Sequence, residues 1–131
     1  MKTKGRFTSA DVRAVTTELK PTLEGCHLQN IYDIDNKKYL FKFTKKSAKV
    51  VLMVESGVRV HATKYDRENL DTFPSSFVTK LRKHLRDRRL TAFSQLGFDR
   101  VVHLEFGHDS KPEMTFHLFL EFYALVPFVY Y

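Results

Sequence analysis

Four short segments of strand character follow one another in the first half of the chain, and they limit its fold more than any other feature. Each is rich in Val, Leu, Phe or Tyr; they cover residues 28–33, 39–44, 50–54 and 58–62. They are separated by turn residues at 35–37, 45–47 and 55–57. Strands joined this closely predict a β-meander.

A helix is expected to precede the meander. Thr8 or Ser9 is a suitable N-cap, Asp11 lies in the first turn, and apolar residues recur at helical spacing up to residue 23. We expect Pro21 to end or kink this helix and Gly25 to close the segment.

A second helix is predicted after Pro74, which suits the start of a helix. Its apolar residues fall within one arc and predict a core face: Phe77, Val78, Leu81 and Leu85. Its basic residues fall on the opposite side and predict a basic outer wall: Arg82, Lys83, Arg86 and Arg89. Further strands are expected at residues 91–98, 100–106 and 114–123, which gives an α+β chain in a single domain.

Positive charge is concentrated in two parts of the sequence. The net charge is +7, and residues 37–49 hold six Lys and no acid. Residues 76–100 hold seven basic side chains against Asp87 and Asp99. Such clusters attract phosphate backbones through counterion release, although a single charged run is usually a solvated face. Two runs in one small domain favour a nucleic-acid partner.

Common catalytic and cofactor motifs are absent from the sequence. The six His show no metal-binding spacing, and neither a dinucleotide-binding nor a P-loop glycine motif is present. We therefore expect no metal, no cofactor and no catalytic residue. Cys26, the only cysteine, is interpreted as a structural thiol.

The composition also bears on location. A lone cysteine forms no intramolecular disulfide, so a reducing compartment, most simply the cytoplasm, is expected. No signal peptide is expected, and the longest charge-poor apolar run, residues 123–131, is far short of the ~20 residues that a membrane helix needs.

Residues 97–100, with the sequence GFDR, form the most informative local cluster. Asp99 and Arg100 can pair with each other at a turn, or they can present a carboxylate and a guanidinium to a base, ribose or phosphate. The residues alone favour the simple turn. Asp11 alone would be a helix-dipole residue.

Four motifs in order resemble one known family. They read NIYDIDNKKYL at 30–40, ESGVRVH at 55–61, PSSFVTKLRKHL at 74–85 and RRLTAFSQLGFDR at 88–100. Their order and spacing resemble the NFACT-N domain, which begins the eukaryotic ribosome quality control subunits also called nuclear export mediator factors. Bacterial relatives include fibronectin-binding-protein-like factors. The resemblance runs from about Arg6 to Phe122.

The resemblance implies a β-sandwich with flanking helices, similar to the N-terminal domain of formamidopyrimidine-DNA glycosylases. Those enzymes use an N-terminal proline as nucleophile, whereas this chain has Lys2 and Thr3, so glycosylase catalysis is not expected. Residues 1–124 would form the NFACT-N domain. Residues 125–131, LVPFVYY, depart from the family pattern and are interpreted as the atypical tail of a truncated chain.

The function implied by the resemblance is binding, not catalysis. The family recognises the large ribosomal subunit obstructed by peptidyl-tRNA, recruits aminoacyl-tRNA for template-free C-terminal tailing, and helps an E3 ubiquitin ligase to act on the stalled chain. No membrane is implied. Its residues implicated in tRNA handling match Asp11, Asp99 and Arg100.

The basic wall of Arg82, Lys83, Arg86 and Arg89 would lie next to Asp99 and Arg100 and hold the RNA backbone. Two alternatives stay open. One is a nucleic-acid lyase on the glycosylase-like fold, and the other is a non-functional or purely protein-interacting truncated fragment.

Overall fold

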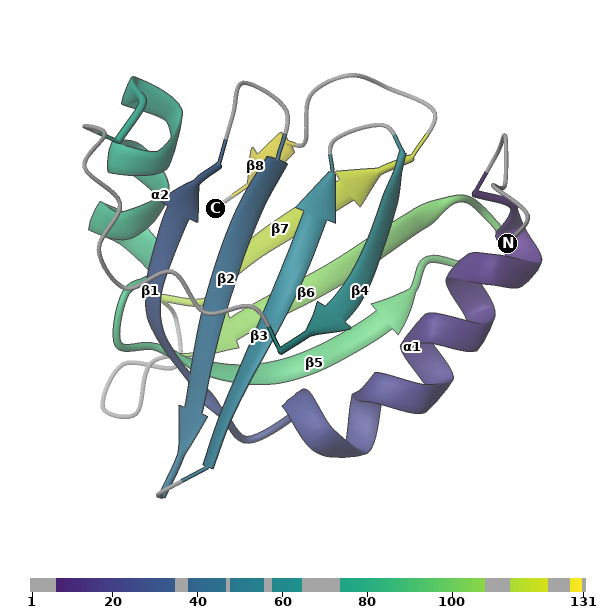
Figure 1. Cartoon of the computed structure of the whole chain (residues 1–131), viewed down its shortest axis with the longest axis horizontal. Helices are drawn as coiled ribbons and strands as arrows, with labels where there is room; N and C mark the ends of the chain where they lie inside the picture. Colours follow the sequence, from purple (N-terminus) through teal and green to yellow (C-terminus); the bar gives the residue numbers. More distant parts are fainter. Residues whose placement is uncertain are drawn as a thin grey trace.

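The computed structural model describes residues 7–34, 38–46, 48–55, 58–64, 74–107, 114–122 and 128–130. The described residues form two helices and eight strands (Figure 1). The helices are α1 (Ser9–Leu23) and α2 (Ser76–Leu85). The strands are β1 (His27–Asp33), β2 (Lys38–Lys45), β3 (Ala48–Glu55), β4 (Arg59–Thr63), β5 (Arg89–Gln95), β6 (Val101–Gly107), β7 (Phe116–Glu121) and β8 (Phe128–Tyr130).

The strands form one antiparallel sheet in the order β4-β3-β2-β1-β5-β6-β7-β8. The predicted meander is its first half, β1 to β4. The second half, β5 to β8, joins the first through the residue pair His27–Arg89 and through flanking backbone hydrogen bonds. In two of these, Leu28 N donates to Arg88 O (2.9 Å) and Leu90 N donates to Cys26 O (2.7 Å).

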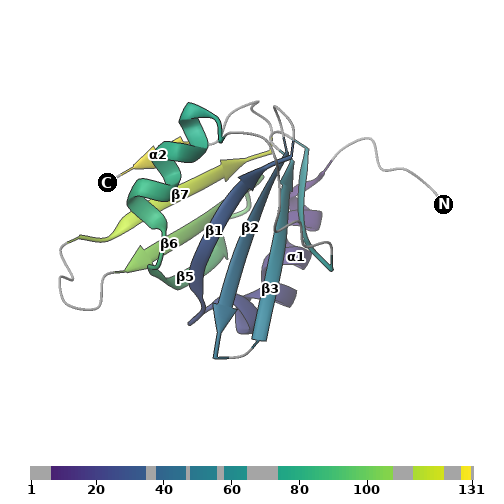
Figure 2. The same cartoon turned by 60° about the vertical axis from the view of Figure 1, so that its left-hand side comes forward.

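The two halves of the sheet fold over one another about this narrow junction. Helix α1 contacts β4 at one edge of the sheet and also β5 and β6 in the other half, which a flat sheet would not allow. Figures 1 and 2 show the β1–β4 half crossing the β5–β7 half, with α1 and α2 on opposite sides of the molecule. The buried side chains of both halves and both helices form one cluster.

Matching bulges shape the two strands at the junction. The register shifts between Leu28 and Asn30 in β1 and between Leu90 and Ala92 in β5. Because a bulge adds one residue, side chains three positions apart come to the same face of the strand. Leu28 and Ile31 of β1 are therefore both buried, and so are Leu90 and Phe93 of β5.

Helix α1 begins as the sequence predicts. Thr8 is the N-cap: its Oγ1 accepts a hydrogen bond from Asp11 N (3.1 Å), and Asp11 Oδ2 accepts one from Thr8 N (2.9 Å). The expected end at Pro21 is wrong, because the helix runs on to Leu23 and Glu24 N still donates to Lys20 O (3.0 Å). Gly25 follows with a φ of +95°, which suits glycine.

The first basic run is not a uniformly solvated face. Strand β2 is buried on both faces, and Lys42 is only 2% exposed. The alternation of Leu40 and Lys42 with Phe41 and Phe43 therefore does not separate a core face from a solvent face. Lys42 is removed from the surface charge that the sequence attributes to residues 37–49.

Other expectations have mixed outcomes. The α+β class is confirmed. The two layers, β1 to β4 and β5 to β8, belong to one continuous sheet. The similarity to glycosylases stays a prediction. The strand expected at 91–98 ends at Gln95, and residues 128–130 form β8, which the sequence did not predict. The turns expected at 35–37, at 47 and at 56–57 lie outside the described residues. Neither described helix has the length and apolar character needed to span a bilayer.

A histidine pair lies on the outer face of β6 and β7. His103 Nε2 and His117 Nδ1 are 2.8 Å apart, and the His103 ring stacks on Phe119 with centroids 4.8 Å apart. Burial lowers the pKa of His103 below its ordinary value of 6.5, His117 lowers it further, and Glu105 partly opposes this. The folded chain therefore favours neutral His103.

Replacing the N-cap should weaken the fold. Thr8→Ala removes the acceptor for Asp11 N, and we expect a loss of about 1 kcal/mol in the free energy of unfolding, measured in urea. Thr17→Ala, on the exposed side of the same helix, should cost nothing. Equal stability of the two variants would contradict the capping role.

Acid should also destabilise the chain. Because the folded pKa of His103 is depressed, its stabilising effect is complete above pH 6.5 and is lost as the pH falls through its folded pKa. We expect His103→Gln to flatten the decline of unfolding free energy below pH 6.5. An unaltered pH profile for His103→Gln would refute the assignment.

Candidate nucleic-acid interface

The N-terminus of α1 and the turn between β5 and β6 are joined by one side chain. Gln95, the last residue of β5, donates from Nε2 to Ser9 O (3.0 Å) and to Asp99 O (2.8 Å). This amide places the segment that holds Asp11 beside the one that holds Asp99 and Arg100. We call the first turn of α1 together with residues 96–100 the helix–turn site.

The turn at residues 96–100 has a defined backbone. Leu96 N donates to Val101 O (3.0 Å), and Asp99 N donates to Leu96 O (3.1 Å). Gly97 has a φ of +60°, and a Cβ added there would meet nothing within 4 Å. The turn thus needs glycine for its backbone conformation, and it leaves open space beside that residue.

Asp99 and Arg100 are held by local contacts. Asp99 Oδ1 accepts a hydrogen bond from Arg100 N (2.8 Å), and Arg100 O accepts one from Phe122 N (2.8 Å). The Phe122 ring contacts Phe7, just before α1, edge-on with centroids 5.2 Å apart. Packing of Phe122 against Phe7 therefore supports the helix–turn site.

Asp11 has a structural role at this site. Its Oδ2 accepts hydrogen bonds from both Thr8 N (2.9 Å) and Thr8 Oγ1 (3.0 Å). A carboxylate at this end of a helix also interacts favourably with the helix dipole, as the sequence predicts. These contacts with Thr8 fix the Asp11 carboxylate at the first turn of α1.

A groove runs from the helix–turn site between α1 and β5, with a cavity volume of about 220 Å³. Cationic and hydroxyl side chains of α1 face residues of β5 and the turn across it: Arg13, Thr16, Thr17, Lys20, Phe93, Ser94, Gln95 and Gly97. Two cations, Arg13 and Lys20, line one wall of this groove.

The basic residues predicted to flank Asp99 and Arg100 lie elsewhere. Lys83 is on α2, Arg86 is its C-cap, and Arg89 begins β5 instead of continuing the helix. Since Arg89 and Gln95 are the two ends of β5, about 20 Å of extended strand separates these cations from the helix–turn site. The expected adjacency is wrong, because the helix ends before the basic run does.

Arg82 belongs to the same set but contacts β1. Its Nε donates to Ile31 O (2.9 Å), and its guanidinium carbon lies 5.6 Å from the centre of the Tyr32 ring. It therefore holds α2 against the sheet. We call Arg82, Lys83, Arg86 and Arg89 the α2 basic cluster.

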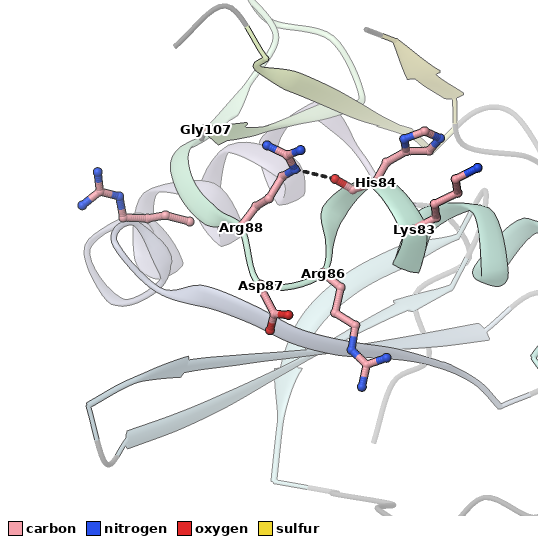
Figure 3. A pocket seen from close by; sticks show the side chains of 7 residues that line it. Lys83, His84, Arg86, Asp87, Arg88 and Gly107 are labelled. Atoms are coloured by element: carbon pink, nitrogen blue, oxygen red, sulfur yellow. Dashed lines mark hydrogen bonds between the residues drawn. The ribbon is translucent and has the colours of Figure 1, made fainter. Parts of the chain in front are cut away.

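Arg88, for which the sequence predicts no role, connects α2 with β7. Its Nε donates to His84 O (2.6 Å), its Nη1 donates to Met114 O (3.2 Å), and its guanidinium lies over the Phe116 ring at 4.4 Å. Arg88 lines a cleft of about 260 Å³ with Lys83, His84, Arg86, Asp87, Arg89 and Gly107. Arg86 and Asp87 point away from Arg88 (Figure 3), so the cleft does not focus its charges on one point.

The cluster nevertheless produces a positive local potential. The pKa of His84 is lowered by burial and then by the charges of Lys83, Lys80 and Arg88. The charges of these three cations, which are the second cause, also favour an anion nearby.

The described residues offer little to nucleophilic or metal chemistry. Cys26 is buried, its Sγ donates to Thr22 O (3.3 Å), and burial raises the pKa of its thiol against the opposing effect of Lys45. Within the described ranges no group of three or more His, Cys, Asp or Glu is placed to hold a metal ion. Cys26 fits the structural interpretation.

Comparison with known proteins identifies relatives of the chain. Residues 8–125 match the family described as NFACT N-terminal and middle domains. Ribosome quality control complex subunit 2 of Schizosaccharomyces pombe is 48% identical over 124 residues, which are 92% of this chain and 12% of that protein. The human ribosome quality control complex subunit NEMF is 45% identical over 120 residues, 92% of this chain and 11% of that protein. The chain thus spans about an eighth of the length of these relatives.

Solved structures share the fold. The N-terminal domain of the fibronectin-binding protein PavA from Streptococcus pneumoniae superposes with a TM-score of 0.79 at 20% identity, over 94% of this chain and 48% of that one. The N-terminal part of the fibronectin/fibrinogen-binding protein of Streptococcus suis gives 0.76 at 24% identity, over 88% of this chain and 45% of that one.

Removing the bridging amide should loosen the turn. Gln95→Ala loses both hydrogen bonds, and we expect about 1 kcal/mol less stability and faster amide exchange at residues 97–100. Gln29→Ala, at an exposed position of β1, is the matched control and should change neither. Unchanged exchange in the turn of Gln95→Ala would contradict the bridge.

Proposed function

The chain belongs to the family of NFACT N-terminal domains, and from this premise we propose that it is the N-terminal domain of a ribosome-associated quality control factor. In this proposal it works in the cytoplasm as a binding module without enzymatic activity. Its ligands are tRNA and the large ribosomal subunit, and residues 1–124 form the domain that binds them.

One observation carries the proposal. Of the three residues that the family resemblance implicates in tRNA handling, Asp11 is 88 positions or more from the other two in sequence, yet all three lie on two segments that Gln95 ties together. Asp11 lies on one of these segments, and Asp99 and Arg100 lie on the other. A set that is dispersed in sequence and gathered in space suits a common ligand.

The chemistry of these groups suits RNA. The Arg100 guanidinium can donate in a fork to phosphate or to a base edge, and carboxylates accept from base amino groups or from the ribose 2′-hydroxyl. The α2 basic cluster, about 20 Å away along β5, supplies backbone contacts without sequence preference. Two contacts at this spacing suit a ligand as large as tRNA or ribosomal RNA.

The role of the whole factor would extend beyond this domain. We propose that binding of peptidyl-tRNA and aminoacyl-tRNA by this domain supports template-free tailing of the stalled chain on the obstructed large subunit. Recruitment of the E3 ubiquitin ligase would depend on the full-length protein. The lyase alternative draws no support from a described nucleophile.

Substitutions in the helix–turn site and in the α2 basic cluster should weaken RNA binding in different ways. We expect Asp99→Ala and Arg100→Ala to weaken tRNA binding about tenfold each, because they remove specific contacts. Changing Lys83, Arg86 or Arg89 to Ala should weaken binding to all RNAs alike and should lower the salt dependence by about one ion per contact. Titration of the chain with tRNA at several salt concentrations measures both.

The control for charge alone is Arg59→Ala, since Arg59 lies on edge strand β4, where its Nε pairs with Glu55 (3.1 Å). It should bind tRNA nearly as well as the unchanged chain. A folded chain that binds no tRNA, or one in which Asp99→Ala and Arg100→Ala bind normally, would overturn the proposal.

A further inference from the structure

The turn of the helix–turn site carries an apolar side chain that packing does not explain. Phe98 is 87% exposed, more than any other large hydrophobic residue in the described part of the chain, and Leu96 on the same turn is 49% exposed. Exposing an aromatic ring to water carries a free-energy cost that a partner can relieve.

Phe98 projects from a backbone that is fixed on both sides. The residues around it are held by the hydrogen bonds from Leu96 N to Val101 O and from Asp99 N to Leu96 O, and by Gln95 Nε2 on Asp99 O. A ring on a defined turn loses little backbone entropy when it binds, which is what a recognition contact requires.

The residue that precedes Phe98 borders the groove between α1 and β5. This residue is Gly97, and Arg13 and Lys20 line the same groove from α1. No atom lies within 4 Å of the position that a Cβ would take at Gly97, so a ligand backbone can approach the chain closely there. Arg100 follows two residues after Phe98. An exposed aromatic ring next to a groove that holds basic side chains suits a nucleotide, which combines a flat base with a phosphate.

We propose that Phe98 stacks on an unpaired nucleobase of RNA and that the groove between α1 and β5 receives the adjoining sugar-phosphate backbone. This inference rests on the proposed RNA-binding function and names the part of the RNA that the helix–turn site takes. In an A-form duplex the faces of the bases are stacked on one another, so the ligand is a single-stranded loop or end.

The chain provides a direct optical test. It contains no Trp, so Phe98→Trp creates a single tryptophan whose emission reports on this position alone. We expect strong quenching by an RNA hairpin with an unpaired loop, and little by a fully paired duplex of the same length and charge. Equal quenching by both RNAs, or none by the hairpin, would overturn the stacking.

Affinity variants separate stacking from general hydrophobicity. Phe98→Ala should weaken hairpin binding about 5- to 150-fold, the range expected for one base–aromatic stack. Phe98→Leu should bind as weakly as Phe98→Ala, and Phe98→Tyr should restore affinity. Val58→Ala, at an exposed apolar position (42% exposed) outside the helix–turn site, is the control and should bind normally. A protein partner for this ring would instead leave RNA affinity unchanged in Phe98→Ala.

The outcomes distinguish this inference from the function on which it rests. Normal hairpin affinity in Phe98→Ala together with weak affinity in Arg100→Ala would refute the stacking and leave the proposed function in place. Absence of tRNA and hairpin binding by the folded chain would overturn both.

Discussion

The docking of α1 along β5 is the constraint on which the rest of the structure depends. A helix of 15 residues and a strand of seven are both about 23 Å long, so the two elements match end to end. The start of β5 meets the end of α1, where Gly25 N donates to Leu90 O (2.8 Å). The Glu24 side chain reaches further along the strand, and its Oε2 accepts from Phe93 N (2.9 Å). The end of β5 consequently meets the start of α1, where Gln95 reaches Ser9. The helix–turn site follows from this match of lengths.

The same strand separates two kinds of positive surface. At its start, the α2 basic cluster surrounds the end of α2, where Arg88 donates to a helix carbonyl and burial and neighbouring cations lower the pKa of His84. At its end lie a carboxylate–guanidinium turn and the groove lined by Arg13 and Lys20. One end thus offers charge, and the other offers directional donors, acceptors and an aromatic ring. The β5 strand acts as a spacer of about 20 Å between them.

The features that were predicted correctly are those that depend on residues close together in the sequence. The N-cap at Thr8, the core face of α2 and the β-meander follow from residue type and spacing. Side chains whose role depends on distant partners were not predictable: Gln95 reads as an ordinary polar residue at a strand end, and Arg88 reads as one more surface cation. Lys42 was counted with the surface charge of residues 37–49, because the sequence does not show that β2 is buried on both faces. Arg89 was wrongly predicted to lie on the helix, because α2 ends at Leu85 while the run of basic residues continues to Arg89.

The central claim is that the start of α1 and the β5–β6 turn act as one RNA site, distinct from the α2 basic cluster. Backbone amide chemical shifts of the labelled chain, followed during titration with tRNA, test it most directly. The account predicts that Asp11 and residues 95–100 shift together at the same tRNA concentration and persist at salt concentrations that abolish shifts around Lys83 and Arg86. Shifts confined to the α2 basic cluster, or centred on the outer face of β6 and β7, would contradict it.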